Sequence, residues 1–173
     1  MLQADNEYKY VFKVNVQAIG KPGNRTFRII AETVTASAIL WIEKQQLLQL
    51  VTGIRQLILA TSDRKVPKKI VSELKDTISR NIEFQVGKIS IGEDSLTGKL
   101  FINAHEINQQ INEIETVRLR LWITKKQALD FIEESIAVCE AGRPACQLCG
   151  NPIDQQSHIC PRTNGHYKKL EEL

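Results

Sequence analysis

The residues best suited to chemistry are the cysteines, which gather near one end of the sequence. Cys139, Cys146, Cys149 and Cys160 are the four cysteines among 173 residues. A disulfide framework would spread its cysteines to tie distant segments together, so this clustering favours metal ligation. Cys146-x-x-Cys149-Gly150 has the spacing of a turn in which two thiolates converge on one ion, and glycine accepts the positive φ that such a turn needs.

A second pair of ligands follows one short turn-rich segment later. His158 and Cys160 point to the same side of an extended chain because residues two apart share a face. Together with Cys146 and Cys149 they form a Cys₃His set, the closed tetrahedral set that Zn²⁺ takes in structural sites. The sequence therefore predicts a structural Zn²⁺ site, with His166 as a competitor of His158 for the fourth position.

Other interpretations of the tail stay open. The thiols could pair oxidatively, or His158 could be a surface residue beside a site without metal. A redox motif is disfavoured because the Cys-x-x-Cys turn does not open a helix after a strand. Cys139 is predicted to be a small core residue of the preceding helix. Because so short a tail has almost no apolar core, metal binding, worth about 10–16 kcal/mol in small zinc modules, is predicted to fold it.

A second candidate site combines Arg25, Glu43 and Lys44. Arg25 follows a Gly-rich turn, and Glu43-Lys44 stands at a strand-to-helix junction, where backbone N–H groups favour anions. These residues predict an alternative function as an enzyme or a binder of a phosphate-containing or nucleotide ligand. The same Glu43 and Lys44 could instead only stabilise the start of the helix.

Basic residues offer two further surfaces. One flanks the cysteine tail, where it could balance the site's negative charge or contact a protein or anionic partner, and comprises Arg143, Arg162, Lys168 and Lys169. The other is a basic stripe along an alternating strand and the residues after it, with Trp122 in its middle, and comprises Arg118, Arg120, Lys125 and Lys126. It predicts nucleic-acid binding as a second alternative, although a solvated outer strand face explains the same pattern.

Hydrophobic periodicity predicts the elements that position these residues. Period-two alternation predicts strands over 8–16, 26–30, 36–41, 82–91, 99–104 and 117–123. Helical spacing predicts a helix over 43–60, buried through Leu47, Leu48, Leu50, Val51, Ile54, Leu57 and Ile58. A later helix is predicted to be buried through Ala128, Leu129, Phe131, Ile132, Ile136 and Ala137. A short helix is expected between Pro67 and Ile78.

The two halves of the chain resemble each other. Leu40–Leu48 aligns with Leu121–Leu129, and Phe12–Gly20 aligns with Phe84–Gly92. We expect an α+β fold in which a duplicated β-β-β-α repeat forms a pseudo-twofold, mainly antiparallel six-stranded sheet, with helices on one face and a small C-terminal zinc hairpin. The expected parts are residues 8–80 with the extra short helix, residues 81–142, and the hairpin at 143–166.

Composition excludes several classes of protein. The chain is 42% hydrophobic and 25% charged with a net charge of +3, which is ordinary for a globular protein and too mild to indicate nucleic-acid binding. No apolar run approaches the roughly 20 residues that span a bilayer. The polar, acidic start lacks the features of a secretion signal, so a cytoplasmic protein is expected. Walker loops and Gly-x-Ser-x-Gly elbows are absent from the sequence.

The sequence resembles an uncharacterised bacterial family, a domain of unknown function. The family pattern G-x-P-G-x-R-T-F matches Gly20–Phe27, and G-R-P-x-C-x-L-C-G-x-P-x-D-x-x-x-H-x-C-P-R-x-N-G matches Gly142–Gly165. Glu43-Lys44-x-Gln46 and Phe84-x-Val86-Gly87 also match, whereas Gln147 stands where the family has proline. The resemblance implies zinc but no established activity. It also implies genes for a phosphoinositide-kinase-like and a histidine-phosphatase-like protein nearby, which suggests a pathway with phosphate chemistry.

A closed metal set without a catalytic constellation beside it favours one function over the alternatives. We expect a non-catalytic zinc protein that presents its zinc hairpin to a protein or anionic partner.

Overall fold

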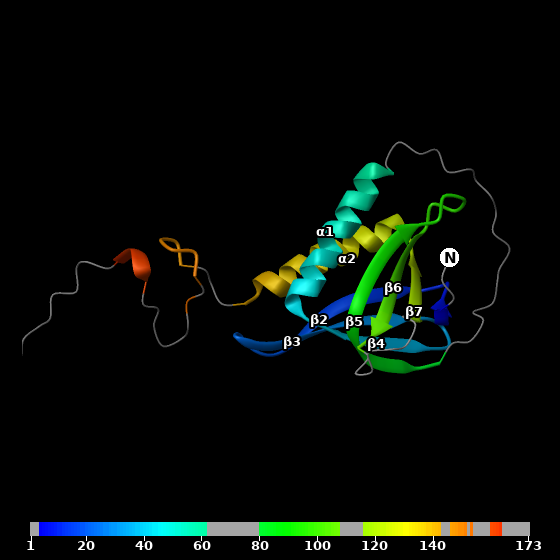
Figure 1. The fold of residues 1–173 in the computed structure, drawn as a ribbon, viewed down its shortest axis with the longest axis horizontal. Coiled ribbons are helices and arrows are strands. Elements are labelled where there is room, and N and C mark those ends of the chain that lie inside the picture. The colour runs from blue at the N-terminus through cyan, green and yellow to red at the C-terminus, as the bar shows by residue number, and fades with distance from the viewer. Residues whose placement is uncertain are drawn as a thin grey trace, which may run out of the picture.

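The structure is a computed structural model that describes residues 4–61, 80–107, 116–142, 146–151, 153 and 160–163. In chain order its elements are β1 (Ala4–Tyr8), β2 (Lys13–Lys21), β3 (Asn24–Glu32), β4 (Ser37–Ile42), α1 (Lys44–Ala60), β5 (Ile82–Glu93), β6 (Leu100–Glu106), β7 (Val117–Ile123), α2 (Lys125–Glu140) and the 3₁₀ turn η1 (Pro161–Thr163) (Figure 1). The architecture is mixed α+β, as predicted.

The described strands form one sheet in the order β1-β7-β6-β5-β4-β3-β2. Antiparallel pairing joins β2, β3 and β4, and again β5, β6 and β7. Two parallel pairs, β4 with β5 and β1 with β7, complete the sheet. The turn predicted at Gly20–Gly23 is present, because Lys21 pairs with Asn24 and Gly20 and Gly23 take positive φ.

The sheet curves back on itself. β1 and β2 lie at opposite edges, yet only residues 9–12 separate them, and four residues span at most about 14 Å. The backbone N–H of Phe12 still donates to the carbonyl of Glu32 on β3, at 3.0 Å. The two edges must therefore come close, and the inward residues of all strands share one hydrophobic core, among them Tyr8, Leu40 and Leu119.

Two helices cover this core side by side (Figure 1). α1 packs on β5 and α2 on β2, with Leu47 and Phe131 fully buried. Leu48 and Leu129, both predicted to be buried, are 40% and 50% exposed, so the buried stripe of each helix is narrower than predicted. Among the residues that the structure describes, neither helix combines the length and the apolar character that crossing a lipid bilayer requires.

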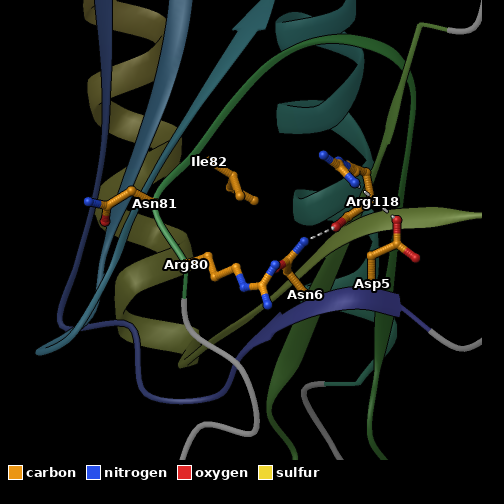
Figure 2. A pocket seen from close by; sticks show the side chains of 6 residues that line it. All are labelled: Asp5, Asn6, Arg80, Asn81, Ile82 and Arg118. Atoms are coloured by element: carbon orange, nitrogen blue, oxygen red, sulfur yellow. Dashed lines mark hydrogen bonds and ion pairs between the residues drawn. The ribbon is translucent and has the colours of Figure 1, made fainter.

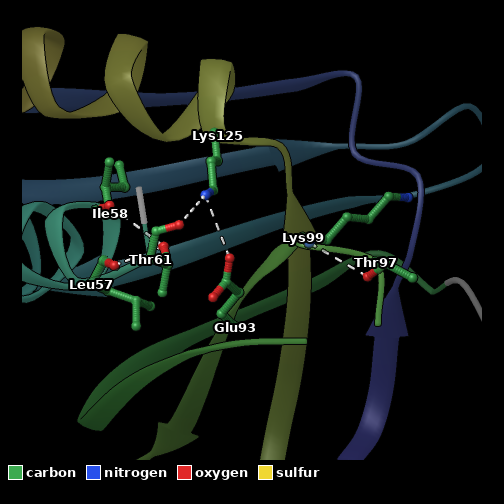
Figure 3. Close-up of polar contacts among 7 residues, drawn as sticks. All are labelled: Leu57, Ile58, Thr61, Glu93, Thr97, Lys99 and Lys125. Carbon is green, nitrogen blue, oxygen red and sulfur yellow. Dashed lines mark hydrogen bonds and ion pairs between the residues drawn. The ribbon is translucent and has the colours of Figure 1, made fainter. Parts of the chain in front are cut away.

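Each helix begins with a lysine that reaches the end of the other helix. Lys44 Nζ donates to the carbonyl of Cys139 at 3.0 Å. Figure 3 shows the corresponding contact of Lys125, whose Nζ donates to the carbonyl of Thr61 at 3.3 Å. Since C-terminal carbonyls carry partial negative charge, both contacts stabilise helix ends. Lys125 also lies 3.5 Å from the carboxylate of Glu93, whose side chain is only 4% exposed.

The described sheet has seven strands rather than the predicted six. The expected strand over 8–16 is two strands, and the segment before residue 8, predicted to be a polar tail, forms β1. Polar residues of β1 can be buried because they find partners: Asn6 Nδ2 donates to the carbonyl of Arg118 at 3.1 Å, and the Tyr8 hydroxyl donates to the carbonyl of Ser37 at 3.0 Å. The short helix predicted between residues 67 and 78 lies outside the described residues.

Candidate metal centre

Three cysteines converge at the C-terminal end of the described chain. The Sγ atoms of Cys146, Cys149 and Cys160 all lie within 4.8 Å of one another, and those of Cys146 and Cys160 are 3.8 Å apart. This separation is too long for a disulfide, whose sulfurs lie about 2.05 Å apart. A tetrahedral Zn²⁺ with Zn–S bonds of about 2.3 Å holds its sulfurs about 3.8 Å apart, so the separation of Cys146 and Cys160 fits such an ion, and Cys149 lies close enough to join them.

A tight backbone turn sets the first two thiols. The N–H of Gly150 donates to the carbonyl of Cys146 at 2.8 Å, and the N–H of Cys146 donates to the carbonyl of Asn151 at 2.7 Å. Gly150 has φ of +76° and, if a Cβ were added, nothing would lie within 4 Å of it. Glycine is therefore required by backbone conformation and not by crowding.

Gly150→Ala is expected to weaken metal binding at these thiols about five- to thirtyfold, because a left-handed φ costs a side-chain-bearing residue about 1–2 kcal/mol. Competition with a metal chelator measures this change. Gly142→Ala is the matched control: Gly142 has no positive φ, and an added Cβ would make only ordinary contact with the Cys139 carbonyl. Equal affinity in the two variants would contradict the prediction.

Backbone hydrogen bonds prepare the site for a cation. The N–H groups of Cys149 and Leu148 lower the pKa of the Cys146 thiol to about 6 because they stabilise its thiolate. Desolvation raises the pKa of Cys149, and the neighbouring thiols Cys160 and Cys146 act in the same direction. A metal-binding thiol must be deprotonated, so Cys146 is the ligand best prepared to receive an ion.

Arg162 ties the second arm of the site to the first. Its Nη1 donates to the carbonyl of Leu148 at 2.9 Å. Arg162 lies in η1, which begins at the residue after Cys160. The contact holds the two arms together and brings a positive charge to a site with a lowered thiol pKa. Arg143, Lys168 and Lys169, predicted to flank the site, lie outside the described residues.

The described residues supply three candidate metal ligands, Cys146, Cys149 and Cys160. The predicted fourth ligand, His158, and its competitor His166 both lie outside the described residues. Cys139 lies in the hydrophobic core, and burial raises the pKa of its thiol, in agreement with its prediction as a core residue.

Arg25, Glu43 and Lys44 do not form a common site in the described structure. Glu43 is the N-cap of α1 and shares a capping box with Gln46, and Lys44 donates to the carbonyl of Cys139. Arg25 lies on β3 opposite Gly20, and no contact of the described residues joins it to Glu43 or Lys44. Glu43 and Lys44 thus stabilise helix ends.

The arginines of the predicted basic stripe on β7 pair with residues of neighbouring strands. Arg118 lies 3.4 Å from Asp5 and 3.3 Å from Glu106. Arg120 is only 5% exposed and donates to Asn103 Oδ1 at 2.8 Å, so the prediction of a solvated face is wrong at this position. Such a face offers little free positive charge to a phosphate backbone.

A polar pocket of about 350 Å³, not expected from the sequence, lies at the edge of the sheet (Figure 2). Three segments far apart in the sequence line it, with Asp5 and Asn6 from β1, Arg80 to Ile82 at the start of β5, and Arg118 from β7. No local motif marks these residues. Only the pairing of β1 with β7 could have indicated that they meet.

Comparison with known proteins places the chain in a family. A family model with the description "Protein of unknown function (DUF3090)" matches residues 6–160. No curated protein and no solved structure matches the chain. The match covers β1 from Asn6 onward, the other six strands of the described sheet, both helices and the three clustered cysteines.

Proposed function

Since the chain belongs to the DUF3090 family, whose description gives no function, we propose a function from its site: a zinc protein with a structural Cys₃His centre that binds a protein or anionic partner. The convergence of Cys146, Cys149 and Cys160 carries this proposal. Their separations suit a tetrahedral ion, and thiolate sulfur is a preferred ligand of Zn²⁺.

Zinc in this site would act on the structure of the tail. His158 would complete four coordination positions, and a closed set of four protein ligands is typical of structural zinc. Bound zinc would lock together the turn at 146–151 and the arm that begins at Cys160, as the Arg162 contact with Leu148 already does in part. The remaining donor groups of Arg162 and the basic residues beside it would then face a partner from a rigid support.

The proposed metal site also supports a reducing compartment. Cys146, Cys149 and Cys160 must be reduced if they are to bind a metal ion together. Thiols at this distance stay reduced in the cytosol and oxidise outside it. We therefore propose a cytoplasmic location for this bacterial-type protein.

Elemental analysis of protein purified without added metal tests the proposal. We expect one zinc per chain. His158→Asn is expected to lower the affinity for zinc, whereas His166→Asn leaves it unchanged; the reverse result would assign the fourth position to His166. Zinc-free protein whose Cys146 and Gly150 amides exchange equally slowly with and without a chelator would overturn the proposal.

We also propose that the body of the protein is a duplicated β-β-β-α repeat. Matching contacts support this: Trp41 Nε1 donates to Glu83 at 2.7 Å, and Trp122 Nε1 donates to Glu7 at 2.7 Å. Residues 8–80 and 81–142 would then be the two repeats, the first extended to include all of β1, with the zinc hairpin at 143–166 appended.

Strand pairing supports the same correspondence with one correction. Leu40 pairs with Phe84, and Leu121 pairs with Tyr8, each across a parallel pair of strands. If Leu40 corresponds to Leu121, the counterpart of Phe84 is Tyr8 and not Phe12, so the second predicted alignment is out of register. On this view β1 and β2 together correspond to the single long strand β5.

The first turns of the two helices also support the duplication. Glu43 with Gln46, and Thr124 with Gln127, form capping boxes at equivalent positions. Gln46 Nε2 also donates to the carbonyl of Gly87, and Gln127 Nε2 to the carbonyl of Val11, each just beyond the parallel segment. A shared set of side-chain contacts of this kind favours common descent of the two halves.

A further inference from the structure

A polar pocket lies where three parallel strands begin (Figure 2). β1 runs parallel to β7, and β5 runs parallel to β7 because β6 is antiparallel to both. The first residues of all three strands therefore meet at one end of the curved sheet. The pocket of about 350 Å³ is large enough for a small ligand.

The walls of the pocket are held in place by hydrogen bonds that leave donors available. Asn6 is 7% exposed and its Nδ2 donates to the carbonyl of Arg118. Asn81 Oδ1 accepts from the backbone N–H of Ser37 at 2.9 Å, so the amide is oriented by that bond. The Tyr8 hydroxyl donates to the carbonyl of Arg80 and so anchors the backbone at the start of β5.

Two arginines define the charge of the pocket. Arg118 is held by Asp5 at 3.4 Å and Glu106 at 3.3 Å. No ion pair of Arg80 is found among the described residues, and in Figure 2 its side chain extends toward Asn6, with Ile82 nearby. One arginine of the pocket thus has its charge balanced by carboxylates, while the other offers a guanidinium to a ligand.

We propose that this pocket binds the oxyanion of a small ligand, a phosphate or a carboxylate group, through Arg80 and Arg118. Guanidinium groups present paired N–H donors that match two oxygens of such an anion. An arriving oxyanion competes with Asp5 for Arg118 and is repelled by the Asp5 carboxylate, so Asp5 limits the affinity. The pocket shares no residue with the candidate metal centre, so the two proposals are independent.

Titration of the full chain with inorganic phosphate and with acetate at constant ionic strength tests the proposal, with amide chemical shifts as the readout. We expect saturable shifts at Asn6 and Asn81. Arg80→Gln is expected to weaken binding about tenfold or more, the loss expected when a charge-assisted hydrogen bond is removed. Asp5→Asn should instead tighten binding about two- to fivefold. Arg55→Gln, on the exposed side of α1, is the matched control and should bind as the parent does.

The two probes distinguish the source of the oxyanion. Tighter binding of phosphate assigns the pocket to phosphate-containing ligands, and tighter binding of acetate assigns it to carboxylates. Either result supports the proposal when the Arg80 and Asp5 variants shift affinity in opposite directions. Absence of saturable binding, equal binding by Arg80→Gln and Arg55→Gln, or weaker binding by Asp5→Asn would each overturn it.

Discussion

Replacing Cys146 with serine is expected to reduce the zinc affinity of this protein by more than about 100-fold, because a hydroxyl is a poor substitute for a thiolate ligand. Cys146 is the ligand whose thiolate is stabilised by the N–H groups of Cys149 and Leu148. Cys139→Ala is the matched control, since Cys139 lies in the hydrophobic core and not with the other three thiols. Zinc content after dialysis measures the effect.

Loss of the ion should affect the tail and leave the body folded. Cys146 and Cys160 are buried, yet neither belongs to the hydrophobic core formed by the sheet and helices. In Cys146→Ser, or in the parent with a chelator, the amides of Cys146 and Gly150 should therefore exchange faster, while those of β6 and α2 keep their protection. Unchanged zinc content in Cys146→Ser, or equal loss of zinc in Cys139→Ala, would contradict the prediction.

The sequence predicted most elements because their patterns are local. The alternation of Val117, Leu119, Leu121 and Ile123 defines β7, whose four apolar residues are all buried. The cysteine cluster could be predicted for the same reason, since both predicted pairs of ligands lie within one short segment. In both cases the information lies within a few consecutive residues.

Features that depend on distant partners could not be predicted in this way. β1 contains Asp5, Asn6 and Glu7 and has no apolar alternation, and it is a strand because β7 lies beside it. Arg120 is buried because Asn103 on β6 accepts its hydrogen bond. The polar pocket has the same origin, because residues more than 70 positions apart line it.

The helix predictions failed where the helices meet solvent. Leu48 and Leu129 are rotated by about 100° around the helix axis from the buried residues Leu47 and Ala128, which places both leucines at the edge of the buried stripe. Both are exposed at equivalent positions of α1 and α2. Apolar residues at the edge of a helical stripe are thus ambiguous until the neighbouring elements are known.

Lys125→Met is expected to lower the free energy of unfolding by about 2–4 kcal/mol, because it removes an ion-pair partner of a carboxylate that is almost fully buried. Glu93 has a side chain only 4% exposed, and Lys125 Nζ lies 3.5 Å from it while also donating to the Thr61 carbonyl at the end of α1 (Figure 3). Lys44→Met is the matched control. Lys44 makes the corresponding contact with the Cys139 carbonyl, but it is exposed, so its loss should cost only about 0.5–1 kcal/mol.

Urea unfolding separates the ion-pair role of Lys125 from its role at the end of α1. The four proteins to compare are the parent, Lys125→Met, Lys44→Met and the double variant Lys125→Met with Glu93→Gln. Adding Glu93→Gln to Lys125→Met should restore most of the lost stability, because the neutral amide needs no cation. Equal losses in Lys125→Met and Lys44→Met, with no recovery in the double variant, would mean that helix capping alone accounts for the lysine at this position.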